Sequence, residues 1–265
     1  MKYFEIVDEE NNMSIGTLIY YEKEHSFIIE LQDYLDEWSA PLLFMNHVKK
    51  GIFTISREFS LMWVKARIIP SGRQNINSIL ANHKLKSYDE MKFLELSHGR
   101  CSQDSLYVRK IHELPEFAQK RRNTNLTDCV VLDDSNILCF FEDNSVKKVD
   151  MKKLAKLDNI DKVLNNKRLF DSCKVGTGGY FITFNDSIDI DRNDLYAAGA
   201  EIPLTKNDFM LFVKKNLLDT TESCELLECS RQNLSYMVKE GQLSPIRENI
   251  KGNLYLKGDI LKNQW

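Results

Sequence analysis

The stretch 217–261, LLDTTESCELLECSRQNLSYMVKEGQLSPIRENIKGNLYLKGDIL, carries the strongest pattern in the chain. Thr220 or Thr221 is placed to cap a first helix, and Ser230 to cap a second. Gly241 stands where the end of the second helix needs a left-handed residue. Two short extended segments and the start of a third helix complete the stretch. Its order of helix, tight turn, helix and hairpin predicts a winged helix-turn-helix.

The two helices divide into an apolar and a polar side. The apolar residues predict one shared core, made of Leu226, Leu227, Leu234, Met237 and Val238. The second helix then presents a polar face of Arg231, Gln232, Ser235, Tyr236 and Lys239. This face is the candidate recognition surface of the stretch.

The same stretch resembles the excisionase and MerR-type DNA-binding domain over about 45 residues. The shared features are a Thr followed by small residues, Leu-Leu, Ser-Arg-Gln, a Val-Lys-Glu-Gly-x-Leu end and an acidic residue before the last helix. The resemblance implies that the second helix enters the major groove of DNA and that the hairpin follows the backbone as a wing.

Within that geometry, Arg231 can reach O6 and N7 of guanine, and Gln232 or Asn233 can pair with adenine. Arg247 or Lys251 of the wing can contact phosphates. The full set expected to contact DNA in this stretch is Ser230, Arg231, Gln232, Asn233, Ser235, Tyr236, Lys239, Arg247 and Lys251.

The charge of the stretch argues against tight binding by a single copy. From Asn216 onward six bases face seven acids, a balance of −1. Because neutralisation of phosphates dominates affinity for DNA, one such module binds weakly. We therefore expect a homodimer that binds a repeated site bivalently. The alternative is a winged helix that is retained for contact with a protein.

A second stretch, 71–85 with the sequence SGRQNINSILANHKL, repeats Arg-Gln-Asn and the apolar register that follows it. We predict a helix capped by Ser71, with an apolar stripe on one side and Arg73, Gln74 and Asn77 directed outward. Together with the neighbouring helical segments it could form a compact bundle. Arg73, Gln74 and Asn77 are further candidates for contact with DNA, although no family resemblance accompanies them.

Charge is distributed unevenly over the first third of the chain. Residues 1–37 carry ten acids against two bases, a balance of −8. Residues 38–87 carry eight bases against the single acid Glu58, a balance of +7. The basic block is expected either to bind phosphates or to match the acidic block within the molecule.

The order of strands and helices expected in the rest of the sequence predicts an α+β, multidomain protein. Strands begin the chain, helices follow, and strands return near Thr127 with a turn at Asp143 and Asn144. The segments FEDNSVKKVDMKKL, RLFDSCKV and SIDIDRNDLYAAG resemble a small bacterial domain of unknown function, family 2442, which implies no chemistry. The predicted domains are 1–124 (α+β with a basic helical segment), 127–200 (small, strand-rich α+β), 203–216 (connector helix) and 217–265 (winged helix-turn-helix).

Several site types lack the residues that they need. Six cysteines occur without C-x-x-C and five histidines without metal-ligand spacing, so we expect neither a disulfide framework nor a metal, and no cofactor. We interpret Asp191 as a helix cap, because a calcium loop would need Gly and Glu where Asp194 and Ala200 stand. Near His98, Cys101 and Asp104 are expected to be core and cap rather than a catalytic pair.

The start of the chain has no signal-peptide pattern, and no apolar run approaches the roughly 20 residues that span a bilayer. The expectation is a cytoplasmic, non-enzymatic regulator of transcription without a membrane partner. It would bind double-stranded DNA as a repressor of bacterial or mobile-element origin, and could regulate its own gene. The alternative is an inhibitor or adaptor of the antitoxin or phage counter-defence type, which binds a protein partner through the acidic first 37 residues.

Overall fold

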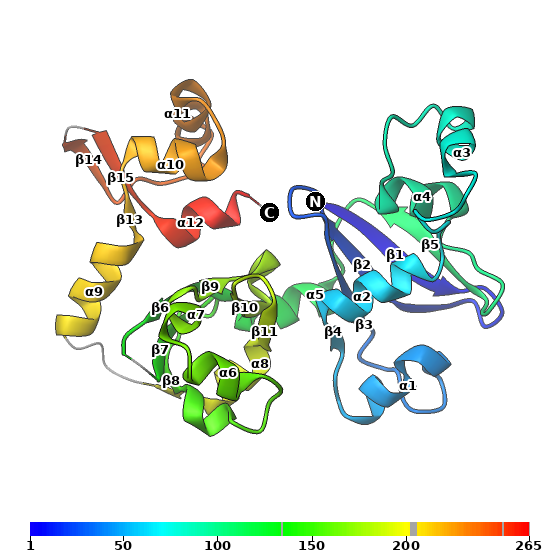
Figure 1. The fold of residues 1–265 in the computed structure, drawn as a ribbon, viewed down its shortest axis with the longest axis horizontal. Coiled ribbons are helices and arrows are strands. Elements are labelled where there is room, and N and C mark those ends of the chain that lie inside the picture. The colour runs from blue at the N-terminus through cyan, green and yellow to red at the C-terminus, as the bar shows by residue number, and fades with distance from the viewer. Residues whose placement is uncertain (134, 202–205, 251, 265) are drawn as a thin grey trace. The chain divides into compact units, whose positions relative to one another are not determined.

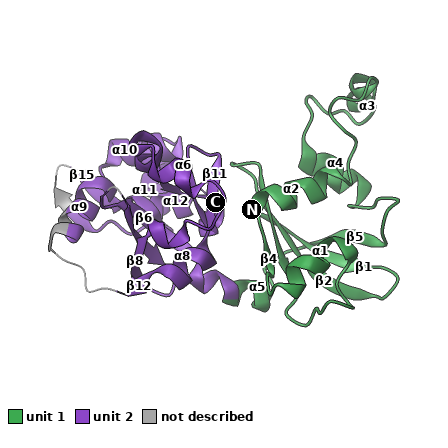
Figure 2. Cartoon of the chain, turned by 60° about the horizontal axis from the view of Figure 1, so that its bottom comes forward, with its two compact units in different colours: residues 1–120 green, residues 121–265 purple. Residues whose placement is uncertain are grey.

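The protein is described by a computed structural model that covers residues 1–133, 135–201, 206–250 and 252–264. It is an α+β protein, as predicted, with several small sheets and many short helices. The chain divides into two compact units, residues 1–120 and 121–265 (Figure 2). Lys251, one of the residues expected to contact DNA, lies outside the described residues.

Unit 1 is built on an antiparallel sheet of five strands in the order β4-β3-β2-β1-β5. Phe4 and Ile6 are buried in the core, whereas Tyr3 and Glu5 beside them are only partly buried, so one side of this strand faces the core. The tight pairing of β2 with β3 requires Gly16, since a Cβ atom there would lie 2.3 Å from Glu30 O. The strands are β1 (Lys2–Asp8), β2 (Met13–Tyr21), β3 (Ser26–Leu31), β4 (Thr54–Ile55) and β5 (Leu106–Ile111).

Five helices accompany this sheet, and α2 lies along β3 (Figure 1). Ser56 caps the start of α2, because its Oγ accepts from Phe59 N at 3.3 Å. The buried Ser60 of the same helix accepts from Ile29 N at 3.1 Å and donates to Ile55 O at 3.2 Å, which satisfies strand backbone groups. The helices are α1 (Leu42–Lys49), α2 (Arg57–Lys65), α3 (Ile76–Asn82), α4 (Glu90–Ser97) and α5 (Glu116–Arg121).

The predicted start of the helix after Ser71 is wrong. α3 starts at Ile76, and the preceding residues form turns in which Arg73 N donates to Pro70 O and Ile76 N to Arg73 O. α3 contains no buried residue and projects from the rest of unit 1 (Figure 2). It is therefore not a member of a compact helical bundle. Gly72, a poor helix former, is part of the reason that the turns prevail.

Unit 2 begins with a strand-rich part that contains two antiparallel sheets, ordered β12-β8-β7-β6 and β11-β10-β9. The predicted turn at Asp143 and Asn144 joins β7 to β8, and Asn144 has the left-handed φ of 66°. Asp191 caps α8 as predicted, since its Oδ1 accepts from Asn193 N at 2.7 Å. The strands are β6 (Leu126–Val131), β7 (Asn136–Phe141), β8 (Val146–Asp150), β9 (Lys174–Val175), β10 (Phe181–Phe184), β11 (Ile188–Asp191) and β12 (Ala200–Glu201).

Short helices close the core of this part, in which Ile137, Phe170 and Phe184 are buried. They are η1 (Arg122–Thr124), η2 (Met151–Leu154), α6 (Ile160–Leu164), α7 (Lys167–Asp171), η3 (Thr177–Gly179) and α8 (Arg192–Ala198). A helix found where the connector was predicted, α9 (Lys206–Asn216), packs on the strand-rich part through Phe212, whose ring centroid lies 4.5 Å from that of Phe140.

The end of the chain forms three helices around a small sheet ordered β13-β15-β14. Leu227, Leu234, Leu243, Tyr255 and Ile260 are buried in its core. The predicted partners Leu226, Met237 and Val238 pack against this core while partly exposed. The elements are β13 (Leu217–Leu218), α10 (Thr220–Leu227), α11 (Arg231–Lys239), β14 (Arg247–Ile250), β15 (Gly252–Leu256) and α12 (Lys257–Lys262).

α12 also packs against β6 of the strand-rich part. Gly258 makes the approach possible, because a Cβ atom there would lie 2.5 Å from Thr127 O. Lys262 Nζ lies 3.2 Å from Glu142 Oε2 and adds an ion pair. In the part of the chain that the structure describes, no helix combines the length and apolar character needed to cross a membrane.

Candidate nucleic-acid interface

α10 starts at a cap that differs from the prediction. Asp219, not Thr220 or Thr221, is the N-cap: its carboxylate accepts from Glu222 N, and Glu222 Oε2 accepts from Asp219 N, both at 2.8 Å. This reciprocal capping box satisfies two backbone donors at the helix start. The helix ends at Glu228, which adopts the left-handed conformation and reverses the chain toward α11.

α11 starts as predicted at Ser230, whose Oγ accepts from Asn233 N at 3.2 Å. The helix is anchored by Leu234, which is almost fully buried. Gly241 follows it with a φ of 72°, in the left-handed conformation that the sequence predicted. Two caps and one buried side chain thus fix the position and length of this helix.

The outward side of α11 holds the predicted recognition residues. Arg231 Nη2 donates to Thr221 Oγ1 at 3.0 Å, so the hydroxyl group from α10 steadies the guanidinium ion and leaves its other donors available. No local pattern in the sequence indicates this contact, which joins residues ten positions apart. The exposed residues at the start of the helix and along it are Ser230, Arg231, Gln232, Asn233, Ser235, Tyr236 and Lys239.

The hairpin that follows supplies one described cation. Arg247 is exposed at the start of β14 and pairs in register with Leu254 of β15. The charges around it are mixed, because five exposed glutamates lie on or next to these helices and this hairpin: Glu222, Glu225, Glu228, Glu240 and Glu248. The surface can therefore offer hydrogen bonds to base edges, but it has no strong positive field.

The second Arg-Gln-Asn stretch is placed differently. Arg73 and Gln74 lie in the turns before α3, and Asn77 is its second residue. All three are exposed. Arg231, in contrast, is the first residue of α11, so the two arginines do not occupy equivalent positions of their helices.

The residues near His98 form a polar loop in which Cys101 faces a carboxylate. Cys101 Sγ lies 3.5 Å from Asp104 Oδ1, and Asp104 also binds the guanidinium group of the buried Arg67. Asp104 caps the start of β5 rather than a helix, because its Oδ1 accepts from Leu106 N at 3.1 Å. Cys101 is only partly buried, and the expectation that it is a core residue is wrong.

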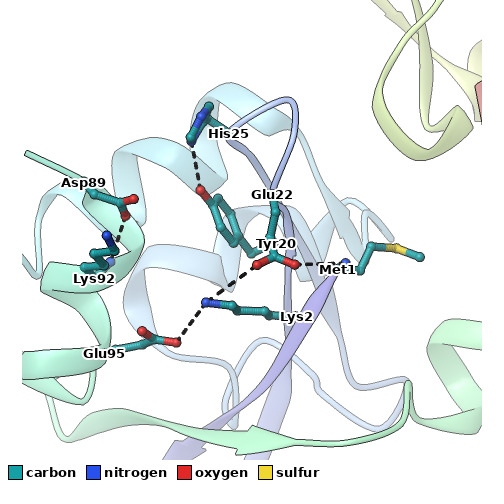
Figure 3. Close-up of polar contacts among 8 residues, drawn as sticks. All are labelled: Met1, Lys2, Tyr20, Glu22, His25, Asp89, Lys92 and Glu95. Atoms are coloured by element: carbon teal, nitrogen blue, oxygen red, sulfur yellow. Dashed lines mark hydrogen bonds and ion pairs between the residues drawn. The ribbon is translucent and has the colours of Figure 1, made fainter. Parts of the chain in front are cut away.

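A further polar cluster joins β1, β2 and α4 in unit 1 (Figure 3). Lys2 Nζ lies 3.4 Å from Glu95 Oε1 and 3.7 Å from Glu22 Oε1. Tyr20 Oη lies 3.0 Å from His25 Nδ1. Burial, and then nearby carboxylates of which Asp89 is the strongest, raise the pKa of Tyr20 to about 12. The phenol is therefore neutral at physiological pH, and the cluster attaches α4 to the sheet.

Comparisons with protein-family models, with curated proteins and with solved structures found no match to this chain. Among the described residues, no group of three or more His, Cys, Asp or Glu side chains is arranged to hold a metal ion. The geometry of the α11 face is therefore the structural evidence for this face as the candidate site.

Proposed function

We propose that the protein is a sequence-specific DNA-binding regulator of transcription whose C-terminal elements act as a winged helix-turn-helix. One observation carries the proposal: α11 buries Leu234 while it exposes Arg231, Gln232 and the polar residues that follow, and Thr221 holds Arg231 in place. A short helix with a capped, polar N-terminal end suits insertion into the major groove, where the first residues meet base edges.

In this proposal the contacts divide into two kinds. Arg231 binds O6 and N7 of guanine, and Gln232 or Asn233 binds adenine, which supplies specificity. Ser230, whose hydroxyl hydrogen stays available after capping, and Arg247 of the wing bind phosphates, which fixes the register on the duplex. The family resemblance of 217–261 supports the same arrangement.

The mixed charge of the surface implies a dimer. A single module with a balance of −1 releases few counterions, so two linked modules on a repeated site are needed for tight binding. We propose that the protein represses transcription in this dimeric form, and that one target is the promoter of its own gene.

The test is fluorescence anisotropy with DNA from upstream of the protein's own gene, over a series of salt concentrations. Arg231→Ala should cost about 1–3 kcal/mol and relax specificity at one base pair, because the guanine contact is lost. Arg247→Ala should weaken binding to all sequences and lower the salt slope by about 1, as expected for a phosphate contact.

The matched control is Arg168→Ala, an exposed arginine of α7 outside the proposed interface, which should bind as the wild type does. Arg73→Ala tests whether the turn before α3 adds phosphate contacts. Undiminished binding by Arg231→Ala would contradict the assignment of α11 as the reading helix. If the wild type fails to bind at low salt, the regulator proposal itself is wrong.

A further inference from the structure

Unit 1 contains a cavity of about 550 Å³ beside an unusually exposed tryptophan. Trp38 and Leu42 line it with 88% and 84% of their surface exposed. They are the two most exposed large apolar side chains in the described part of the chain. A protein that leaves an indole ring in water beside a concave surface commonly uses it as an anchor for a partner, because aromatic side chains dominate binding energy at interfaces.

The segment that carries Trp38 is held firmly on both sides. Leu35 and Ala40 are buried in the core of unit 1. Between them, Asp36 Oδ1 accepts from Trp38 N at 2.9 Å and from Ser39 N at 2.8 Å. The indole ring is thus presented outward by an ordered turn, so binding loses little conformational entropy of the backbone.

The lining of the cavity is acidic. Its acids are Asp8, Glu10 and Asp104, and none of the residues that line it is a lysine or arginine. Arg67 balances Asp104, which leaves the charges of Asp8 and Glu10. Asp8 accepts from Ser105 Oγ at 2.6 Å and from Asn11 Nδ2 at 2.7 Å, and these bonds hold its carboxylate in position.

We propose that this cavity docks a basic segment of a partner protein. An arginine side chain of the partner stacks on the Trp38 ring, its charge is balanced by Asp8 and Glu10, and an apolar neighbour covers Leu42. Charge decides the class of partner: the cavity lining holds three acids and no lysine or arginine, which repels the phosphates of nucleic acids and of anionic lipids and attracts cations. An exposed indole ring adds a cation–π attraction that favours arginine.

The probe is a fluorescein-labelled hexa-arginine peptide titrated with the full chain and followed by anisotropy. We expect saturable binding that weakens with salt, exceeds that of hexa-lysine and is absent with labelled hexa-glutamate. Trp38→Ala should weaken binding about ten-fold, and Glu10→Gln about three-fold. Since both side chains are exposed, neither change should perturb folding, which circular dichroism will verify.

The matched controls lie on α2: Met62→Ala removes another exposed apolar side chain, and Glu58→Gln another exposed acid. Both should bind the peptide as the wild type does. Equal binding by wild type and Trp38→Ala, or equal binding of hexa-arginine and hexa-glutamate, would overturn the proposal. Sedimentation supplies a second check. If Trp38→Ala abolishes self-association while hexa-arginine does not bind, the occupant is a second copy of the chain and the proposal is wrong. Trp38→Ala should leave DNA binding unchanged, so this test is separate from that of α11.

Discussion

Asp128 on β6 offers a sharp test of how the C-terminal helices are attached. Its carboxyl group is buried beside α12, where it accepts from Cys129 N at 2.8 Å. The other oxygen, Oδ2, has no hydrogen-bond partner of normal geometry, although Gly258 and Lys257 lie nearby. Burial raises the pKa of Asp128 from its ordinary 3.8 to about 6, against the smaller opposing effects of Cys129 N, Lys257 and Gly258 N.

The sign of the effect on stability follows from this raised pKa. Well below pH 3.8 the carboxyl group is protonated in the folded and the unfolded chain, so its burial carries no penalty of ionisation. As pH rises from 3.8 to about 6, the unfolded chain releases the proton first, and the free energy of unfolding falls. At about 1.4 kcal/mol per pH unit the loss totals about 3 kcal/mol above pH 6.

Asp128→Asn should remove this dependence on pH. An amide keeps the acceptor for Cys129 N but cannot ionise, so the stability of the variant relative to wild type should improve by about 2–3 kcal/mol between pH 4 and pH 7.5. The cost of burying the amide group is the same at both pH values and cancels in that difference. Hydrogen exchange of peptides from β6 and β7 measures this difference. The protection factor of the variant divided by that of wild type should rise on the order of 100-fold from pH 4 to pH 7.5.

Wild type and variant are compared at each pH, so the intrinsic exchange rates cancel. Asp158→Asn, which changes an exposed aspartate in the same unit, is the control and should show no such change. A ratio of protection that stays constant from pH 4 to pH 7.5 would refute the reasoning, because it would mean that Asp128 titrates alike in the folded and the unfolded chain.

Three further substitutions have expected outcomes. Gly258→Ala should destabilise unit 2 by about 1–3 kcal/mol despite the better helix propensity of alanine, because its Cβ would meet Thr127 O; the same exchange experiment measures it. Asp219→Ala should cost about 1 kcal/mol in protection of α10 by removing the capping box, whereas Thr220→Ala should cost much less. Thr221→Val should weaken DNA binding in the anisotropy assay by a few-fold, because the recognition guanidinium ion loses its support, and it should leave the melting temperature nearly unchanged.

Local patterns predicted those parts of the fold in which neighbouring residues decide the structure. Ser230 and Gly241 bound α11 as expected, since a cap and a left-handed residue act within one helical turn. Asn144 similarly identified the turn between β7 and β8. The exposed side of α11 also followed from helical periodicity, because a buried Leu234 fixes which residues face outward.

Other parts of the fold could not be predicted, because the sequence fits two or more local structures equally well. Asp219, Thr220 and Thr221 are three consecutive cap residues, and only the phase of α10 selects the first. Before α3, the turns from Pro70 to Ile76 compete with a helix whose apolar stripe finds no core to bury it. Trp38 is a case of the same kind, since a tryptophan among acids fits a core or a surface equally well.

Tertiary contacts lay beyond the sequence altogether. The bond between Thr221 and Arg231 depends on how α10 crosses α11. The approach of Gly258 to Thr127 depends on the packing of α12 against β6, between segments more than a hundred residues apart. No local pattern specifies either contact, because the two residues of each pair come together only when the complete fold has formed.

The docking of α12 bears on how the proposed DNA-reading helix is supported. The C-terminal elements bury few large apolar side chains, chiefly Leu227, Leu234, Leu243, Tyr255 and Ile260, and a core of that size is marginal by itself. Contact with β6 adds buried area and so stabilises the helices that carry the proposed recognition residues. Stability and recognition should then separate: Asp128→Asn changes the pH dependence of unfolding without touching a DNA contact, whereas Arg231→Ala removes a contact without touching the core. Equal loss of DNA affinity in both variants at neutral pH would show that this separation is wrong.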